Sequence, residues 1–458
     1  MPENTQTTVL DPKLIRESID YLANRLSIKK WDLSASSSKD ISAQVFKGEA
    51  KQLKASQRSA ITLRVWNKNN LVGITSTSDL SRNGLELALK TAYEASNYGN
   101  KKEIPDFSPM ARTVLESFER PLHKSVGVTE LFNRLRDAER LLLAKHRLIS
   151  SIPYNGFAEC DYERVYLNSD GALRSLRNTH ASIYLYAKAH QDGRKPRTGG
   201  SIRIGHGCSD IDVQECINEA AEKTISHLDY EPIETGKYLI CFSPEAFLEL
   251  VSSFSNIFNA RSIIDGTSLS TRETLGQQIA SPLLNINDNG LHPSNIGGFN
   301  FDGEGTPVRN ISLVENGILT NLLHSESTAK LYDVEPTGHA GIGSKVSVSP
   351  DWLIVSRTKD YKVANTLNHK KTKIEFILIE NLQALHAGIK ATQGSFSLPF
   401  DGWLVREGVK KSIESATIAG DIKSLLNNIV QIEEEIKNTH SGISPHVWVE
   451  GLSVTGEK

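Results

Sequence analysis

The sequence predicts an α+β protein of two parts: an N-terminal α/β part with antiparallel strands and helices, and a C-terminal, mostly antiparallel β part that is barrel-like or sandwich-like. Over about the first 230 residues, stretches with helical spacing of apolar residues alternate with long strand-like stretches. After residue 290, short apolar runs alternate with glycine-containing turns. The expected division is residues 1–231, subdivided near 1–105 and 122–231, and residues 232–458.

The chain is predicted to begin with a helix and two long strand regions. The helix follows Asp11-Pro12, because apolar residues there recur at intervals of four, three and four. Strand regions are expected near 42–54 and 61–76, where the composition alternates between apolar and polar residues. Asn69-Asn70 lies between apolar runs and is expected to turn the chain.

A second helix is expected before a proline-rich connection. Ser78 or Asp79 can cap the start of this helix, and Gly99 can close it. Residues 100–125 contain Pro105, Pro109 and Pro121 and are predicted to form a linker.

The segment after this linker is predicted to repeat the order helix, strands, helix. A helix is expected over 129–146 with Thr129 as its cap. Strands follow from 148 to 206, with Asp170-Gly171 as a hairpin turn, and a fourth helix covers about 212–228. This order is compatible with an internal duplication, although no residue-level repeat supports one.

The C-terminal part is predicted to hold one prominent helix among many strands. Ser243-Pro244 provides a cap and a first-turn proline for a helix over 244–259. Asn316-Gly317 between apolar runs is the strongest short-range hairpin signal, and Glu407-Gly408 is a second turn signal. A further short helix is expected near 421–430.

Composition and charge exclude several classes of protein. The net charge of −2 provides no field that would attract nucleic acid or an anionic membrane surface. Four scattered cysteines without a CxxC pair argue against a disulfide framework and a zinc knuckle. Neither an apolar run of membrane-spanning length nor a secretory leader is recognised, so a cytoplasmic protein is expected.

The stretch from Gly298 to Gly341 carries the most informative motifs. It contains the loop Phe301-Asp302-Gly303-Glu304-Gly305, then the turn Glu315-Asn316-Gly317, then the segment Thr337-Gly338-His339-Ala340. This order resembles the TldD/PmbA family, once labelled modulators of DNA gyrase. The resemblance covers most of the chain, and it extends to segments 73–80, 168–171, 236–244 and 416–420.

The resemblance implies a cytoplasmic peptidase family with two kinds of subunit. TldD-type subunits bind zinc through a helix with His-Glu-x-x-x-His and a cysteine near the C-terminus, and the glutamate is the general base. In this chain no histidine occurs between His227 and His292, and no cysteine follows Cys241. The chain therefore resembles the TldE (PmbA) type, with no catalytic residue, metal ligand or cofactor of its own and with zinc expected in a TldD-type partner.

This resemblance implies that the chain shapes a chamber and holds extended polypeptide during proteolysis or peptide maturation, by strand addition to an exposed edge. Glycines let a backbone approach a substrate strand closely. The candidate substrate- or partner-facing residues are Asp302, Glu304, Gly305, Thr337, Gly338 and His339. No direct contact with nucleic acid or a membrane is expected, and a homodimer without the partner stays open.

Two other functions stay open at this point. One is a hydrolase with an atypical site around Asp302, Glu304 and His339. The other is an interaction protein that modulates a DNA-associated partner such as gyrase. A structural role is favoured for all three residues, because acids in glycine-rich loops usually form turns. A surface or hydrogen-bonding role is likewise expected for His440 and His446.

Overall fold

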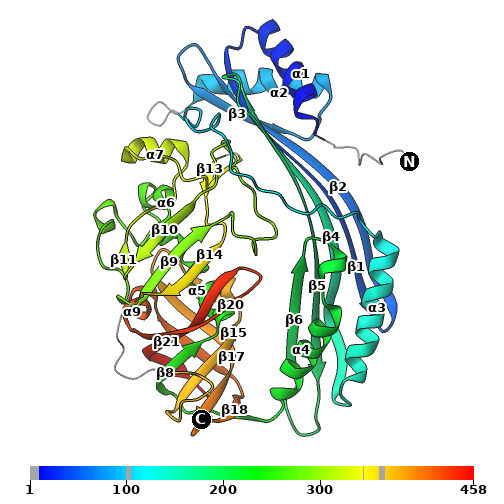
Figure 1. Cartoon of the computed structure of the whole chain (residues 1–458), viewed down its shortest axis with the longest axis vertical. Coiled ribbons are helices and arrows are strands. Elements are labelled where there is room, and N and C mark those ends of the chain that lie inside the picture. Colours follow the sequence, from blue (N-terminus) through cyan, green and yellow to red (C-terminus); the bar gives the residue numbers. More distant parts are fainter. Residues whose placement is uncertain (1–9, 100–104, 344, 360–366, 458) are drawn as a thin grey trace.

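The computed structural model describes residues 10–99, 105–343, 345–359 and 367–457, and it shows two β-rich parts that face one another (Figure 1). One part is a six-stranded sheet with helices, and the other is a 13-stranded sheet that partly closes on itself. The α+β prediction is confirmed. Residues 100–104 of the predicted linker lie outside the described residues. Among the described helices, none is both long enough and apolar enough to cross a membrane.

The N-terminal sheet is antiparallel throughout, in the order β3-β2-β1-β4-β5-β6. Its strands are β1 (Lys30–Phe46), β2 (Glu49–Trp66), β3 (Val72–Thr77), β4 (Ile149–Asn168), β5 (Leu173–Ala189) and β6 (Arg197–Gly205). The helices are α1 (Pro12–Arg25), α2 (Arg82–Ala95), α3 (Val128–Ala144) and α4 (Val213–Ser226), with the 3₁₀ turns η1 (Ser96–Tyr98) and η2 (Cys208–Asp210). Each half therefore runs helix, three strands, helix, as predicted, and β1 pairs with β4 to join the halves.

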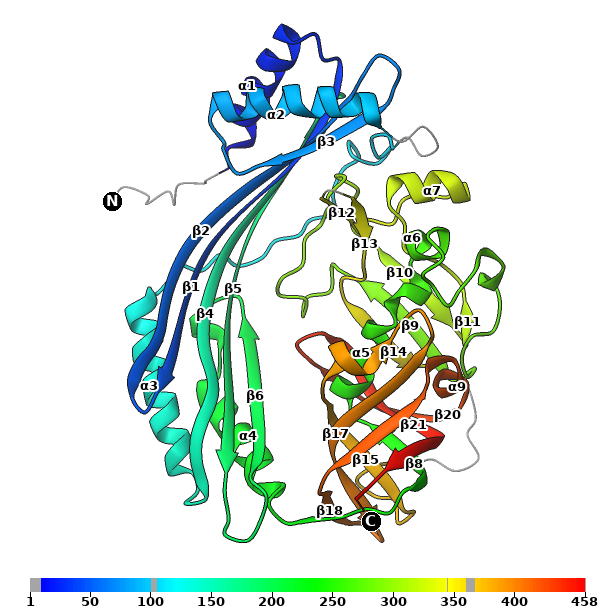
Figure 2. The same cartoon turned by 180° about the vertical axis from the view of Figure 1, so that it is seen from behind.

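Each pair of helices packs on its own end of this sheet (Figure 2). α1 and α2 bury Leu22 and Leu89 against Leu63 of β2. α3 and α4 bury Leu135 and Ile217 in a second, separate core. The two cores share no residue, and full burial of one leucine side chain in either contributes about 1.5–3 kcal/mol.

Two helices begin at residues other than the predicted caps. α2 begins after Ser81, whose hydroxyl accepts a hydrogen bond from the Gly84 amide at 3.2 Å. Asp79 instead accepts from the Ser81 amide at 2.9 Å, so it shapes the approach to the helix. α3 begins after Gly127 at φ +86°, which places Thr129 inside the helix. The start of a helix is the part of its sequence pattern that is hardest to place to the exact residue.

The β1–β2 hairpin corrects the strand predicted near 42–54. β1 ends at Phe46, and Lys47 and Gly48 turn the chain with φ of +55° and +80°. Lysine seldom adopts positive φ, so this turn had no recognisable sequence signature. The predicted turn at Asn69-Asn70 is confirmed, and Asn70 has φ +59°.

Five strands of the C-terminal part close into a barrel, which confirms the barrel-like prediction. The ring runs from β8 (Gly236–Phe242) through β15 (Phe376–Leu382), β17 (Ser395–Arg406), β19 (Ala416–Asp421) and β21 (Gly442–Thr455) back to β8. Only the β8–β15 pair in this ring is parallel. Closure removes the unpaired strand edges that an open sheet would expose.

Further strands and short helices extend from the barrel. The strands are β7 (Tyr230–Glu231), β9 (Leu284–Asn289), β10 (Asn310–Glu315), β11 (Ile318–Leu319), β14 (Leu353–Arg357), β16 (Ile389–Lys390), β18 (Val409–Ile413) and β20 (Ile429–Asn438), with a separate pair β12 (Ala340–Ile342) and β13 (Val346–Val348). The helices are α5 (Pro244–Ser253), α6 (Ala260–Ile264), α7 (Glu326–Tyr332), α8 (Leu385–Gly388) and α9 (Ile422–Asn427), with η3 (Ser255–Phe258) and η4 (Arg272–Thr274). α9 confirms the short helix predicted near 421–430.

The prominent helix α5 starts as predicted and ends earlier. The Ser243 hydroxyl accepts from the Ala246 amide at 3.1 Å, and Pro244 takes the first helical position. The helix stops at Ser253, and η3 follows after Phe254, so the predicted helix 244–259 is two elements. α5 packs against β21 and β15, and this contact fixes its orientation on the barrel.

The hairpin at Asn316-Gly317 is confirmed, with φ of +51° and +78° at its two central residues. The return strand β11 is short and covers only Ile318–Leu319, so the apolar residues Leu322 and Leu323 lie beyond it. A Cβ added at Gly317 would lie 2.3 Å from the Ala280 carbonyl oxygen. The turn therefore requires glycine for space as well as for backbone conformation.

The two parts of the molecule are joined at both ends. At one end, Arg64 of β2 pairs with Glu304 in the C-terminal part, 2.9 Å apart. At the other end, the chain passes from α4 into β7, and His227 Nδ1 lies 2.7 Å from Ser412 Oγ. His227 Nε2 also lies 3.3 Å from Glu380 Oε2. The space between these two joints contains the largest cavity described below.

Candidate functional site

The acidic loop at 301–305 is the centre of a buried ion-pair network. Arg64 Nη1 lies 2.9 Å from Glu304 Oε1, and Arg64 Nε lies 2.9 Å from Asp32 Oδ1. Glu304 also accepts a hydrogen bond from the Glu326 amide at 2.8 Å. Burial alone would lower the pKa of Arg64, but the two carboxylates outweigh it and raise the pKa well above its ordinary value. Glu304 is thus paired within the chain.

Asp302 forms the turn of this loop. Its carboxylate accepts hydrogen bonds from the amides of Glu304 at 2.8 Å, Thr306 at 2.9 Å and Ala340 at 2.9 Å. Burial, together with the neighbouring Glu304, raises the pKa of Asp302 to about 7. These contacts are those of a turn-forming acid that ties two loops together.

His339 lies behind the same loop with its polar neighbours inside the protein. Its Nδ1 lies 3.0 Å from the Thr337 hydroxyl, and its Nε2 lies 3.3 Å from Asp288 Oδ2. Burial lowers the pKa of His339, but Asp288 raises it by more, and the net shift is upward. The Thr337 hydroxyl also accepts a hydrogen bond from the His324 amide at 2.8 Å, so Thr337 links the His339 ring to the backbone at His324.

The six candidate residues from the sequence are therefore gathered in one place and buried. A Cβ added at Gly305 would lie 2.3 Å from the Tyr166 ring, and one at Gly338 would lie 2.3 Å from the Pro307 carbonyl oxygen. The two glycines let segments of this chain approach each other closely. Contact of this region with a substrate or partner stays a prediction.

A large cleft lies elsewhere, between the six-stranded sheet and the barrel, with a volume of about 1670 Å³. On the sheet side, β6 contributes every residue from 198 to 204, and α4 contributes its acidic face. On the barrel side, the cleft is lined by Glu245 and Glu249 of α5 and by Asp351-Trp352. Figure 2 shows β6 on the side of the sheet that faces the barrel. These segments are far apart in sequence, so sequence reasoning missed the cleft.

The cleft is acidic. Its lining carboxylates outnumber its lysines and arginines seven to three. Burial and the neighbouring Glu245 raise the pKa of Glu249 to about 7. Burial, opposed by His339, raises the pKa of Asp351 to about 6. The cleft thus offers polar groups and partial negative charge to a ligand.

Helix α5 presents glutamates to this cleft and carries no histidine. Glu245 and Glu249 are four residues apart and share one helix face. Lys437 Nζ lies 2.8 Å from Glu245 Oε1, so one of the two carboxylates is already paired. The face has no imidazole or thiolate, which are the usual ligands of catalytic zinc besides carboxylates.

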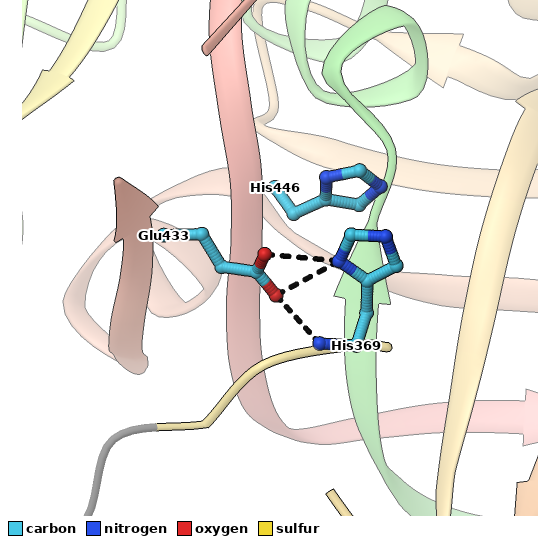
Figure 3. A group of neighbouring side chains, drawn as sticks. All are labelled: His369, Glu433 and His446. Atoms are coloured by element: carbon cyan, nitrogen blue, oxygen red, sulfur yellow. Dashed lines mark hydrogen bonds and ion pairs between the residues drawn. The ribbon is translucent and has the colours of Figure 1, made fainter. Parts of the chain in front are cut away.

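His369, Glu433 and His446 form a second group of polar side chains, shown in Figure 3. His369 Nδ1 lies 2.9 Å from Glu433 Oε2, and the two imidazole rings stack with centroids 3.7 Å apart. The Trp448 indole N–H donates to Glu433 Oε1 at 3.0 Å. Burial raises the pKa of Glu433, but the bonds from His369 outweigh it, and the net shift is downward. Burial lowers the pKa of His446 to about 4.

Sequence reasoning did not find this group. The sequence predicts a surface or hydrogen-bonding role for both His440 and His446; His440 lines the cleft, and His446 stacks on His369. His369 precedes β15, whereas Glu433 lies on β20 and His446 on β21. Because the residues come from separated segments, no spacing rule could bring them together.

Comparison with known proteins identifies what this architecture resembles. Three domain models of the PmbA/TldA metallopeptidases match the chain: domain 1 at residues 31–96, the central domain at 121–228 and the C-terminal domain at 235–456. The metalloprotease PmbA of Escherichia coli O157:H7 is 24% identical over 463 residues, which cover 97% of each chain. A metalloprotease of Methanothermobacter thermautotrophicus is 26% identical over 331 residues, 70% of this chain and 71% of that protein.

Solved structures show the same fold. A putative modulator of DNA gyrase from Thermotoga maritima superposes with a TM-score of 0.85 at 23% identity, over 97% of this chain and 100% of that one. TldE from Thermococcus kodakarensis superposes with a TM-score of 0.81 at 18% identity, over 97% and 99% of the two chains.

Proposed function

The chain belongs to the PmbA/TldA metallopeptidase family, and from this premise we propose that it is a TldE-type subunit without a peptidase zinc site of its own. In this proposal it assists a zinc-bearing TldD-type subunit in cytoplasmic proteolysis or peptide maturation. Its own contribution is to shape the chamber and to hold an extended polypeptide.

The observation that carries the proposal is the chemistry of helix α5. A catalytic zinc site needs three protein ligands and an open position. α5 carries no histidine, the sequence has none between His227 and His292, and no cysteine follows Cys241. A zinc site of the His-Glu-x-x-x-His design therefore lacks its ligands in this chain.

The cleft supports the second half of the proposal, the binding of an extended polypeptide. Among the described strands, β6 pairs only with β5, so its other edge has no partner strand. The backbone carbonyl groups of Gly199 and Ser201 already accept hydrogen bonds from α4 side chains. We therefore place an added strand at the other end of β6, towards Ile204. Strand addition binds the backbone of a substrate and tolerates many side chains.

Mixing experiments test the subunit role. The purified chain alone should not cleave an unfolded polypeptide, whereas its mixture with the zinc-bearing paralogue from the same cell should do so, faster than the paralogue alone. The paralogue should also copurify with the chain. Chelator-sensitive cleavage by the isolated chain would overturn the proposal, as would the failure of any paralogue to associate.

Photo-crosslinking tests the location of the substrate. A photoreactive residue at Ile204, which is 39% exposed on β6, should capture an unfolded polypeptide. The matched control is Leu53, 50% exposed on β2 and outside the residues that line the cleft. Equal capture at both positions would contradict binding in the cleft.

The alternative functions have less support. A hydrolytic site around Asp302, Glu304 and His339 would need accessible groups, but these side chains are buried and their polar contacts lie within the chain. For a modulator of a DNA-associated partner, the net charge of −2 gives no attraction to DNA itself.

A further inference from the structure

The group formed by His369, Glu433 and His446 has a donor set that the proposed function does not use. Its potential ligand atoms all lie within 4.8 Å of one another. Two imidazoles and one carboxylate suit Zn²⁺ and related first-row transition ions, whereas Ca²⁺ and Mg²⁺ prefer ligand sets made of oxygen. Three polar side chains converge here between barrel strands (Figure 3).

We propose that these three residues bind one divalent transition-metal ion, with Zn²⁺ as the natural candidate, in a structural site. This site is separate from helix α5. It would fasten His369 to strand β21 of the barrel and to β20, which pairs with β21.

The side chains must rotate to hold an ion. Nitrogen and oxygen ligands bind Zn²⁺ at about 2.0–2.2 Å, so two donors on one ion lie roughly 3–4 Å apart. The present separations of up to 4.8 Å must therefore shorten, and the two stacked rings must turn relative to each other, because an imidazole nitrogen binds an ion in the plane of its ring. His446 is the only one of the three side chains that is partly exposed.

The surroundings hold the carboxylate in a position suitable for a ligand. Glu433 Oε1 accepts from the Trp448 indole at 3.0 Å and from the His369 backbone amide at 2.8 Å. Such second-layer hydrogen bonds orient the ligands of metal sites. Among the described residues, Oε2 contacts only His369 Nδ1, which also lies 3.1 Å from Oε1. An ion would replace these contacts with one bond to the carboxylate and one to the imidazole.

The position of the group favours a structural role over a catalytic one. Its side chains do not line the large cleft, and His369 and Glu433 are 7% and 3% exposed. A polypeptide in the cleft could not reach an ion held there. The inference is therefore independent of the proposed function, and it departs from the sequence-based expectation of a chain without metal ligands.

Metal titration of the full-length chain tests the inference. After treatment with a chelator, the wild-type protein should bind one equivalent of Zn²⁺, and Co²⁺ should give the visible absorption of a low-coordinate site. His446→Phe keeps a ring stacked on His369 but removes its nitrogen donors, and it should weaken Zn²⁺ binding by about 100-fold or more. His386→Phe, the same change at an exposed histidine of α8, should leave binding unchanged.

Two results would overturn the inference: wild-type protein that binds no stoichiometric metal, and equal affinities for wild type and His446→Phe. Either would mean that the group is only a stacked, hydrogen-bonded pair of histidines with a glutamate. X-ray absorption of the Co²⁺-loaded wild type decides independently of any variant, because it must show two imidazole ligands. Cleavage of peptide by the metal-loaded chain would refute the proposed function while leaving the metal site intact.

Discussion

The acidic loop around Glu304 and the glutamates of α5 are both carboxylate clusters, but the fold uses them in opposite ways. In the loop, Arg64 and backbone amides bind the carboxylates. On α5, Glu249 faces the cleft, and no described hydrogen bond reaches its carboxylate. The motif with the clearest sequence signature is thus part of the framework, whereas the cleft has no recognisable sequence motif.

The largest expected effect is the loss of Arg64 from the loop network. Arg64→Met leaves Asp32 and Glu304 buried without their cation and should lower the free energy of unfolding by about 3–5 kcal/mol. Urea denaturation measures the change. A loss below about 1 kcal/mol would show that the network does not hold the two parts together.

The next effect compares a tightly packed turn with an open one. Gly317→Val forces a β-branched residue to φ +78° against the Ala280 carbonyl and should cost about 1–3 kcal/mol or more. Gly408→Val has a similar φ of +81° but no atom near its added Cβ, so it should cost less. Equal changes in Tm for the two variants would show that backbone strain, not packing, sets the cost.

A pH series distinguishes the cleft glutamate from the framework acids. The pKa of Glu249 rises from 4.5 to about 7 in the folded protein, so the folded state holds this proton more tightly than the unfolded chain does. Its contribution to stability is therefore present at low pH and declines as the pH rises from about 4.5 to about 7. Glu249→Gln should remove this decline, which we expect to be of the order of 1–2 kcal/mol.

The control for this series is Asp302→Asn. The pKa of Asp302 is also raised to about 7, but its carboxylate accepts three backbone amides that an asparagine cannot satisfy fully. This variant should be destabilised at every pH. A Glu249→Gln protein whose stability follows pH as wild type does would show that Glu249 is not the group responsible.

The smallest effect is expected in the cleft itself. Lys437→Met removes the partner of Glu245, but the lysine side chain is 53% exposed, so the pair should contribute at most about 1 kcal/mol. The free energy of unfolding, measured at low and high salt, should differ little from wild type. If Lys437→Met lowered the free energy of unfolding as much as Arg64→Met, the ion pair in the cleft would be as important for stability as the buried network.

Sequence patterns predicted the turns and helix starts that neighbouring residues determine by themselves. Asn316-Gly317 formed its turn because both residues tolerate positive φ. Ser243 and Pro244 started α5 for equally local reasons. The turn at Lys47-Gly48 was missed because lysine rarely adopts positive φ, and the Glu139 carboxylate that binds both turn amides comes from the distant helix α3.

The cleft and the histidine group could not be predicted in the same way. Ile204, Glu249 and Asp351 meet only because two separate parts of the chain face one another. His369 reaches Glu433 and His446 only after the barrel strands have paired. Such groups of residues form only through the topology of the fold, and the spacing of residues in a single sequence does not reveal that topology.

The contacts that join the two parts at the ends of the molecule limit the size of what can enter the cleft. Arg64 and Glu304 join the two parts at one end, and His227 with Ser412 and Glu380 joins them at the other, so the cleft walls are connected on both sides. A folded domain of about 100 residues has a radius of gyration near 13 Å and does not fit within about 1670 Å³. Under the proposed function, a polypeptide could therefore enter the cleft only as an unfolded chain.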